Sequence, residues 1–496
     1  MSTQSETPTL LATLLLALTL LMGGVWWSAE RLQMGHLLSI GSGLPGGATP
    51  LSSAVLQERL SDGHRLLIAT GATPEKYAGV QAIAQGNINA AIPYLETAIA
   101  TNPNDPEALI YLNNARLQGR PTYTLAVIAP IRTDLDRALE ILRGAAQAQQ
   151  EVNQRDGING RSLRILLVDD GEDGAIAAQL ADHLIRDPSV LGVVGHTTHT
   201  ATAAARDRYG AAGLVAISPF DSAIAPSHST SPQFRTIPSD FVTARALADH
   251  LLNRLHQSAA AVFYADNSDD SRSLRDELAT ALSLNGGKIV QDYDLAHPDF
   301  DPSEQVNQAA MQGATALVVL PDLAQRDRAL QVIRANQNRL HLLASAHLYT
   351  AKTLEMAGPE AVGMTLAIPW HAHIDAETPF VRRSRDLWNG EVNWRTALTY
   401  DAMQAFIVAM EQGPTRQGIH QTLQHPDFFA QGGTGIVRFL PTGDRNQGIQ
   451  LVRVQPGFVS GFGYDFVPIP TPFVFPEPPA LGRLREPWGV TQHAWR

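Results

Sequence analysis

Short apolar segments alternate with helical segments from Thr122 onwards, and this alternation restricts the possible folds more than any other feature of the sequence. The expected strands are residues 122–128, 163–168, 190–194, 214–218, 259–264, 288–293, 314–320 and 340–344. Helical stretches such as 135–152 and 175–185 separate them. Because parallel strands need crossover connections, the pattern predicts an α/β protein whose parallel sheets are covered by helices on both faces. These units are too many for one small sheet, so we expect two lobes, with residues 234–240 crossing between them.

The composition fits a folded chain of several segments. A length of 496 residues corresponds to roughly three segments of about 150 residues. The 37 basic and 48 acidic residues give a net charge of −11, and a net-negative surface repels phosphate backbones. Nucleic acid is therefore not expected as a partner. The sequence contains no cysteine, which excludes disulfides, thiolate metal sites, cysteine nucleophiles and a lipid-modified N-terminal cysteine.

The N-terminal segment, residues 10–27, contains no charged residue. As a helix it would extend about 27 Å, close to the hydrocarbon thickness of a bilayer. Trp26 and Trp27 end the segment, as interfacial aromatic residues do. A cleaved signal peptide normally has a basic start and a small-x-small cleavage site, whereas the only charge before this segment is Glu6. We therefore predict that residues 1–30 are an uncleaved membrane anchor; a cleaved signal segment and a buried core helix are the alternatives.

Residues 31–70 are predicted to be a linker, and residues 71–120 an alanine-rich helical segment. The spacing of one tetratricopeptide repeat is matched by Gly79, Gly86, Ala91, Leu95, Ala98 and Pro103. Small residues in such a repeat let two antiparallel helices touch. Residues 106–117 resemble the first helix of a second repeat, and we expect the whole piece to pack on its neighbour. It would act as a spacer or cap, or it would dock a peptide or a protein partner.

The end of the chain has a different character. Two further helices are expected near residues 379–388 and 397–412, followed by short strands near 435–440 and 449–454. Seven prolines lie between Val467 and Pro487, and proline fits neither a helix interior nor the middle of a sheet. Residues 466–496 are therefore predicted to be an extended or disordered proline-rich tail.

Polar residues follow two of the expected strands. Gly-His-Thr-Thr-His-Thr spans residues 195–200, and Ser-Pro-Phe-Asp-Ser spans residues 218–222. Ligands of open parallel sheets bind beyond the carboxyl ends of the strands. Hydroxyls and unpaired N–H groups at a helix N-terminus can receive a carboxylate there. A single hydroxyl such as that of Thr198 or Ser222 could instead merely cap a helix, but two such clusters favour a ligand site.

Motifs of common enzyme classes are absent. The sequence has no Gly-x-Ser-x-Gly elbow, no Walker loop and no His-Glu-x-x-His motif, and Pro45 interrupts the one run of glycines with dinucleotide-loop spacing. Two histidine pairs, His196 with His199 and His371 with His373, lack an obvious third metal ligand. Asp169 and Asp170 end a strand and are read as capping the next turn, with a general-acid role as the alternative. We predict no metal, no cofactor and no catalytic activity.

Several motifs, taken in order and spacing, resemble one family. They are Ala126-Val-Ile-Ala-Pro130, Leu142-Arg-Gly-Ala145, Asp156-Gly-Ile-Asn-Gly160, Leu191-Gly-Val-Val-Gly-His196, Ile217-Ser-Pro219, Phe234-Arg-Thr-Ile-Pro-Ser-Asp240 and Asp299-Phe300. Residues 121–465 resemble the type I periplasmic binding proteins, within them the leucine/isoleucine/valine-binding receptors of ABC transporters. The resemblance implies two Rossmann-like lobes joined by three crossings, with the ligand in a cleft that closes by hinge motion. It also implies that the anchor holds the protein on the periplasmic side of the inner membrane.

The resemblance assigns boundaries and site residues. Lobe 1 would comprise about 121–240 and 370–430, and lobe 2 about 241–369 and 431–465. Members of the family that bind amino acids hold the ligand carboxylate on hydroxyls and N–H groups of lobe 1. The corresponding positions here are His199, Thr200, Phe220 and Ser222. Asp240 matches an acidic position near the ligand ammonium.

Three departures from the family pattern affect the ligand. His199 stands where serine is common, and Asp270 aligns near a tyrosine that often covers the ligand. Ala346 aligns near an expected acidic residue, whose loss would leave an ammonium less well paired. Either Asp270 or Asp322 replaces that carboxylate, or the ligand is not an amino acid.

The sequence thus predicts a receptor that delivers a small polar ligand, an amino acid or a related amide or carboxylate, to an ABC permease or another membrane protein. The alternative is a membrane-anchored sensor or assembly module with a degenerate cleft, suggested by the segment before residue 121.

Overall fold

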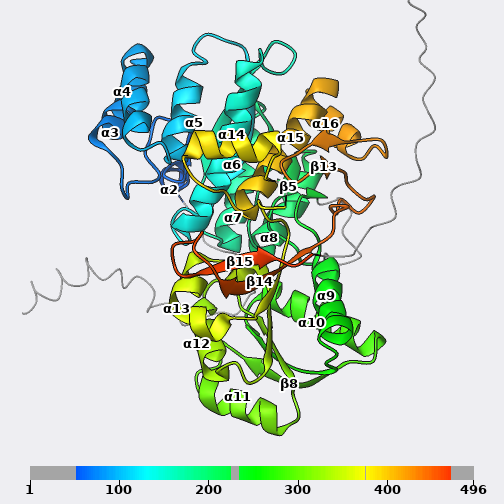
Figure 1. Ribbon diagram of the computed structural model, residues 1–496. Helices are drawn as coiled ribbons and strands as arrows, with labels where there is room; N and C mark the ends of the chain where they lie inside the picture. The colour runs from blue at the N-terminus through cyan, green and yellow to red at the C-terminus, as the bar shows by residue number, and fades with distance from the viewer. Residues whose placement is uncertain (1–51, 225–233, 375, 471–496) are drawn as a thin grey trace, which may run out of the picture. The chain divides into compact units, whose positions relative to one another are not determined.

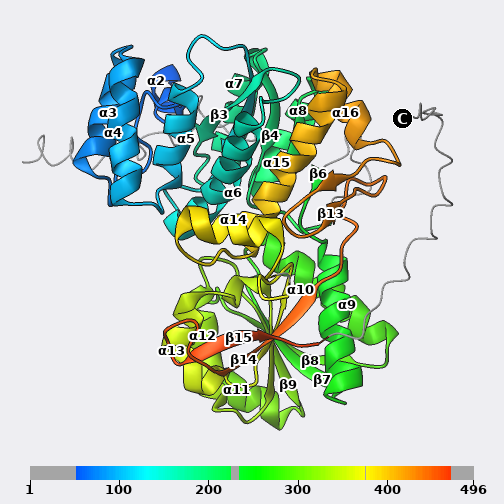
Figure 2. The ribbon, with the colours of Figure 1, turned by 45° about the horizontal axis from the view of Figure 1, so that its top comes forward.

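Two α/β lobes form the described part of the chain (Figure 1, Figure 2). The structure is a computed structural model and describes residues 52–224, 234–374 and 376–470. The predicted two-lobed α/β architecture is confirmed. The chain passes between the lobes three times, between β6 and α9, between β11 and α14, and between β13 and β14. The predicted membrane segment lies outside the described residues. Within the described ranges, no helix is long and apolar enough to cross a bilayer.

Lobe 1 has a six-stranded sheet in the order β1-β3-β2-β4-β5-β6. The strands are β1 (Leu60–Ser61), β2 (Thr122–Ile128), β3 (Ser162–Val168), β4 (Val190–Val194), β5 (Val215–Ser218) and β6 (Phe234–Arg235). The helices are α6 (Leu135–Gln154), α7 (Gly174–Arg186), α8 (His199–Ala211), α14 (Pro379–Trp388), α15 (Trp394–Gln412) and α16 (Arg416–Leu423). All strand pairs are parallel except β1–β3.

Alternation along the central strand builds two cores in lobe 1. Leu125 and Val127 of β2 belong to the apolar cluster that includes α6 and α15. Ala126 and Ile128 belong to the cluster on the other face, with α7 and α8. Successive side chains of a strand point to opposite faces, so a continuous apolar run is buried only between two helical layers.

Lobe 2 has a seven-stranded sheet in the order β15-β14-β11-β10-β9-β7-β8. Its strands are β7 (Ala259–Tyr264), β8 (Lys288–Asp294), β9 (Ala316–Leu320), β10 (His341–Ala344), β11 (Thr365–Ile368), β14 (Gln450–Pro456) and β15 (Tyr464–Pro468). Its helices are α9 (Asp240–Asp249), α10 (Asp269–Leu284), α11 (Pro302–Met311), α12 (Arg326–Asn336) and α13 (Ala351–Ala361), with a π-helical turn at His250–Arg254 and a 3₁₀ turn at Ala346–Leu348. The strands from β7 to β11 pair in parallel, whereas β14 and β15 are antiparallel.

Two boundaries differ from the sequence-based expectation. Residues 431–465 were expected in lobe 2, but the hairpin of β12 (Ala430–Gln431) and β13 (Ile436–Val437) packs on the lobe 1 core. Lobe 2 resumes only at β14. The predicted tail was to begin at residue 466, but residues 466–468 complete β15 and pair with β14. The pairing continues to Ile469, whose N–H donates to the carbonyl oxygen of Leu451 (2.8 Å), and Pro468 is tolerated because β15 is an edge strand.

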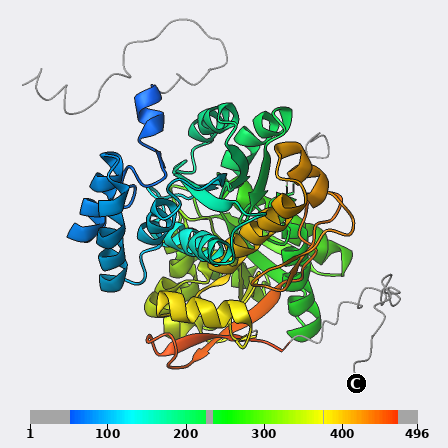
Figure 3. The ribbon, with the colours of Figure 1, turned by 90° about the horizontal axis from the view of Figure 1, so that it is seen from above.

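Residues 52–120 pack against lobe 1 and share its core. Residues 52–70 were expected to belong to a linker, yet they form α2 (Ser53–Gln57) and β1, and Ile68 is buried in the lobe 1 core. The helices that follow are α3 (Pro74–Ala84), α4 (Ile88–Thr101) and α5 (Pro106–Ala115). Every residue of α5 is buried. Figure 3 shows α3 and α4, in blue, beside the cyan helices of lobe 1.

Close approach of α3 and α4 depends on a glycine. A Cβ atom placed on Gly79 would lie 2.7 Å from Cγ of Leu95, which is closer than real side chains approach. Leu95 is fully buried at this contact. Gly79, one of the small residues singled out in the sequence, therefore lets α3 and α4 touch.

A buried ionic cluster fastens this region together. Nζ of Lys76 lies 2.7 Å from Oδ2 of Asp105 and 2.8 Å from Oε2 of Glu107. The hydroxyl of Tyr111 donates to Oε1 of Glu107 (2.8 Å), and the N–H of Leu67 donates to the same atom (2.7 Å). Burial raises the pKa of Glu107. The cluster joins the chain before α3, the first turn of α3 and the start of α5.

Lys76→Met should destabilise the protein by about 3–5 kcal/mol, because it leaves two buried carboxylates without their cation. Arg116→Met is the matched control, since Arg116 pairs with Glu96 at a half-exposed position and should cost less than about 1 kcal/mol. Urea denaturation followed by circular dichroism measures both. Equal losses would show that the buried cluster contributes no more than a surface pair.

Candidate functional site

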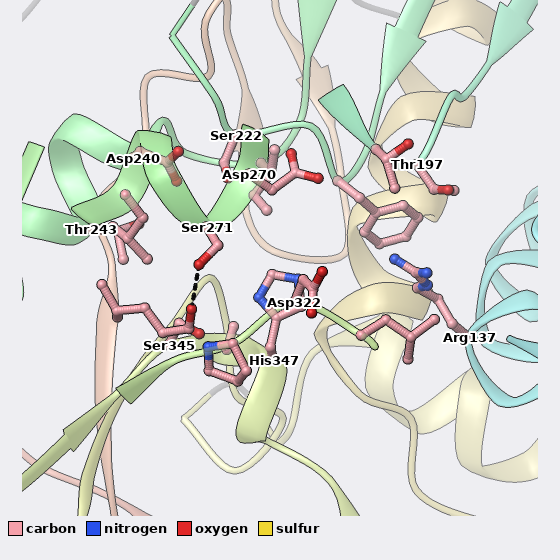
Figure 4. A pocket seen from close by; sticks show the side chains of 18 of the residues that line it. Arg137, Thr197, Ser222, Asp240, Thr243, Asp270, Ser271, Asp322, Ser345 and His347 are labelled. Atoms are coloured by element: carbon pink, nitrogen blue, oxygen red, sulfur yellow. Dashed lines mark hydrogen bonds between the residues drawn. The ribbon is translucent and has the colours of Figure 1, made fainter. Parts of the chain in front are cut away.

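A cavity of about 480 Å³ lies between the two lobes. It is lined mainly by residues that follow the carboxyl ends of strands, as the architecture requires. Lobe 1 contributes Thr197 and Thr198 after β4 and Phe220 and Ser222 after β5. Lobe 2 contributes residues after β7, β9, β10 and β11, among them Asp270, Asp322, Ser345 and His347 (Figure 4).

Six of the eight predicted ligand-binding residues line this cavity. They are Thr198, Phe220, Ser222, Asp240, Asp270 and Asp322. The other two, His199 and Thr200, begin α8 and turn their side chains elsewhere. Nδ1 of His199 lies 3.2 Å from Oδ1 of the buried Asp221, and the hydroxyl of Thr200 donates to Asp269 (3.2 Å). Thr198 also caps α8, because its hydroxyl oxygen accepts from the N–H of Ala201. The capping role considered from the sequence therefore applies to this hydroxyl as well.

One end of the cavity is acidic. Asp240 begins α9, and its side chain is 3% exposed. Oδ2 of Asp240 accepts no hydrogen bond from any residue that the structure describes. Burial raises the pKa of this carboxyl to about 6. Asp270 lies beside it, and burial together with Asp221 and Asp240 holds its pKa well above the ordinary range.

The N-terminus of α8 is already occupied. The backbone N–H of His199 donates to the Asp270 carboxylate with an N···O distance of 3.1 Å. The family resemblance assigned this helix start to the carboxylate of a ligand. Here the anion comes from the protein itself, because Asp270 stands where the resemblance expects a tyrosine. A free N–H and the positive end of the helix dipole attract any carboxylate within reach.

The other end of the cavity is basic. Arg137, Arg326 and Arg395 line it together with His347 (Figure 4 shows Arg137 opposite Asp240). The guanidinium carbon of Arg395 lies 4.3 Å from the centre of the Trp394 ring. Burial, followed by the Arg137 and Arg326 charges, lowers the pKa of Arg395 to about 10. Burial and the same guanidinium groups lower the pKa of His347 to about 3, so its imidazole is neutral.

Sequence reasoning missed these basic residues. His347 follows β10, so the rule of polar strand ends could have found it. Arg137 and Arg326 lie in the first turns of α6 and α12, where a charged residue gives no distinct signal. Arg395 lies at the start of α15, in a part of the chain that returns to lobe 1 from lobe 2. Only the folded arrangement brings these groups together.

The two lobes contact each other directly beside the cavity. Besides the bond between His199 and Asp270, the Thr200 hydroxyl of lobe 1 bonds to Asp269 of lobe 2. Arg326 of lobe 2 lies 3.9 Å from Asp134 of lobe 1. Such contacts can form only when the lobes approach each other, so they belong to a closed arrangement of the cleft.

The histidine pairs have structural partners. The imidazole of His196 is buried between Asp170 (2.6 Å) and the hydroxyl of Tyr209 (3.2 Å). Nε2 of His371 lies 3.1 Å from the carbonyl oxygen of Phe466. No group of metal-ligating side chains occurs among the described residues. Asp170 thus serves His196 and the following turn.

Comparison with known proteins identifies the family. The model of the family described as periplasmic binding protein matches residues 122–458. The chain belongs to the periplasmic binding protein family. Members of this family are ligand receptors and not enzymes, and the family points to a location outside the cytoplasm. The match begins at β2, so it does not include the helix pair α3–α4.

Relatives of this periplasmic binding protein are similar at low identity. An "Amino acid binding protein" of Pseudomonas aeruginosa is 28% identical over 181 residues, which are 35% of this chain and 46% of that protein. The chain thus spans about half the length of this relative. An ABC transporter substrate-binding protein of Desulfitobacterium hafniense in complex with Leu has a TM-score of 0.60 at 20% identity, over 70% of this chain and 100% of the other. A solute-binding protein of Rhodopseudomonas palustris with 3,4-dihydroxybenzoic acid also has a TM-score of 0.60, at 16% identity, over 70% and 96%. These structures support the fold.

Asp240→Asn should stabilise the ligand-free protein at pH 8 by on the order of 2–3 kcal/mol, since one pKa unit corresponds to about 1.4 kcal/mol. A raised carboxyl pKa means that the folded state loses stability as pH rises from about 4 to about 6, and that the loss persists above this window. The gain from the amide should therefore be complete at pH 8 and fade towards pH 4. Urea denaturation across this range measures it.

Asp299→Asn serves as the control because Asp299 is exposed, and it should change stability by less than about 0.5 kcal/mol at either pH. If Asp240→Asn lowered stability at pH 8, the hydrogen bonds of Ser273 and Ser222 to the ionised carboxyl would outweigh the cost of burying it.

Proposed function

We propose that this periplasmic binding protein receives a small polar ligand, an amino acid or a related amide or carboxylate, and delivers it to an ABC permease. The observation that carries the proposal is the cavity between the lobes, whose walls contain buried polar atoms without a hydrogen-bond partner among the described residues. Oδ2 of Asp240 and the hydroxyl of Ser345 have no hydrogen-bond partner among the described residues, and both residues line the cavity. Buried polar groups are normally satisfied, so these are positions for ligand atoms.

Hinge closure would provide the signal to the permease. Three crossings join the lobes, and the contacts beside the cavity link α8 to α10 and the start of α6 to α12. A ligand held by both lobes favours the closed arrangement by its differential affinity for the two states. The uncharged segment 10–27 supports anchoring of the receptor to the inner membrane.

Relatives support the choice of ligand class. The Pseudomonas aeruginosa relative is named an amino acid binding protein, and the Desulfitobacterium hafniense structure contains Leu. By the resemblance, Ser222 corresponds to a position that holds the ligand carboxylate and Asp240 to one near the ammonium, and the two residues are neighbours in this cavity. Asp270 supplies an acidic group near the ammonium position, where Ala346 lacks one.

A second candidate function is a sensor or assembly module that docks a membrane partner through α3 and α4. The specific observation is that Tyr77 and Tyr94 are about half exposed on this tetratricopeptide-like pair, outside the matched family region. Tyr77→Ala with Tyr94→Ala should then remove a crosslinked partner and leave ligand affinity unchanged. Retention of every partner would contradict this second function.

Ser222→Ala and Asp240→Ala should each weaken binding by about 1.5–3 kcal/mol, or roughly 10- to 150-fold in Kd, because each removes a hydrogen bond to a charged ligand group. The ligand comes first from a thermal-shift screen of amino acids, amides and small carboxylates on the purified, ligand-free chain. Isothermal titration calorimetry then gives Kd for each variant.

Ser283→Ala on the exposed side of α10 is the matched control and should bind like the parent protein. Unaltered affinity in both site variants would show that the ligand lies elsewhere. A flat screen of folded protein would contradict the receptor function itself.

A further inference from the structure

We propose that the cavity selects an elongated zwitterion, with a cationic group at Asp240 and Asp270 and a carboxylate at Arg395. This inference rests on the proposed receptor function and specifies its ligand class. It differs from binding of an ordinary α-amino acid, whose ammonium and carboxylate sit on the same carbon and cannot reach both ends of the cavity.

The acidic end has more carboxylates than cationic partners among the described residues. The carboxylates of Asp221, Asp240 and Asp270 gather there, and His199 is the partner of Asp221. The neighbouring Arg235 is already engaged, because its Nε lies 2.9 Å from Asp444 and its Nη1 donates to the carbonyl oxygen of Ala223. Neither Asp240 nor Asp270 has an ion pair with any described residue. A buried carboxylate needs a positive partner, and an ammonium group of the ligand would provide it.

The basic end contains one guanidinium, that of Arg395, without an anionic partner among the described residues. The Arg395 side chain is buried, with 6% of the residue exposed, and it makes no ion pair or side-chain hydrogen bond with any residue in the described ranges. It lines the cavity and lies at the start of the 19-residue helix α15, whose dipole adds positive potential. Trp394 covers one face of the guanidinium by a cation–π contact, which leaves its N–H groups without acceptors.

Nearby carboxylates interact with other groups, and Oδ1 of Asp322 accepts from the backbone N–H of Gln325 (2.8 Å). Glu172 and Asp134 pair with Arg137, and Asp134 also caps α6. Glu140 pairs with Arg143 at 2.5 Å. Arg395 is therefore the free guanidinium of this cluster. An arginine fork of this kind recognises a planar carboxylate by two parallel hydrogen bonds.

The two ends face each other across a middle that contains His347 and the carboxylate of Asp322 (Figure 4). Figure 4 shows Asp240 and Asp270 on one side of the cavity and Arg137 on the other, with His347 between them. Phe220 and the unpaired hydroxyl of Ser345 also line the cavity. The N-terminus of α8 is not available for the carboxylate, because Asp270 occupies the N–H of His199. The carboxylate must therefore lie at the basic end.

The test is a titration of the purified, ligand-free full chain with a homologous series of unbranched ω-amino acids, from 3-aminopropanoate to 6-aminohexanoate. Leucine, pentylamine and pentanoate complete the panel. We expect affinity to peak at one chain length within the series. That member should bind roughly tenfold or more tightly than leucine and than either singly charged compound, because it alone satisfies both ends.

Variants separate the two ends. Arg395→Gln should weaken binding of the best ω-amino acid by roughly tenfold or more but leave the affinity for pentylamine unchanged. Asp240→Asn should likewise weaken binding of the best ω-amino acid but leave the affinity for pentanoate unchanged. Arg395→Lys keeps the buried charge and should retain part of the affinity. It tests the basic end even if the glutamine variant does not fold. Arg382→Gln, on the exposed side of α14, is the matched control.

Each outcome decides the matter. Tight leucine binding that is unaffected by Arg395→Gln would overturn this inference and leave the receptor function standing. Equal affinity along the whole series, or equal losses for pentylamine and the ω-amino acid in Arg395→Gln, would also overturn it. A flat response of folded protein to every compound would overturn the receptor function as well.

Discussion

Two parallel sheets that present the carboxyl ends of their strands to each other determine where the chemistry of this protein lies. Apolar strands such as β2 and β9 are buried between helical layers, so polar side chains can gather only in the loops that follow the strands. Because both lobes point these loops at the same gap, residues as far apart in the sequence as Thr133 and Ile449 line one cavity. The chain topology therefore determines where the site lies, and the side chains in the loops determine its chemistry.

The cavity has acidic groups at one end and basic groups at the other, and Asp240, Asp270 and Arg395 have no ion pair with any described residue. Buried carboxyls at one end have raised pKa values, and a buried guanidinium at the other has a lowered one. Both shifts have burial as their largest cause and like charges as a further cause, so each end disfavours its own charge. Such an arrangement costs stability in the empty protein and becomes favourable when a complementary ligand enters.

Much of this could be predicted from the sequence because period and spacing are local signals. The strands, the two lobes, the crossing at Asp240 and the polar clusters 195–200 and 218–222 all follow from residues close together in the chain. The basic end could not be predicted in this way, since Arg137, Arg326 and Arg395 come from three helices in both lobes. The N-terminal boundary was also hidden: two-residue β1 is too short to show a strand pattern, yet it pairs with β3 and brings residues 52–120 into the core of lobe 1.

Asp270 connects recognition with closure. Its carboxylate bonds across the cleft to the N–H of His199 while it lines the cavity beside Asp240. As a carboxylate it is stabilised by the helix start but destabilised by burial and by its acidic neighbours. A ligand cation placed at the acidic end would remove part of that repulsion and strengthen the bond to the opposite lobe. The same charge would then pair with the ligand and hold the lobes together, so that occupancy and closure depend on each other through one side chain.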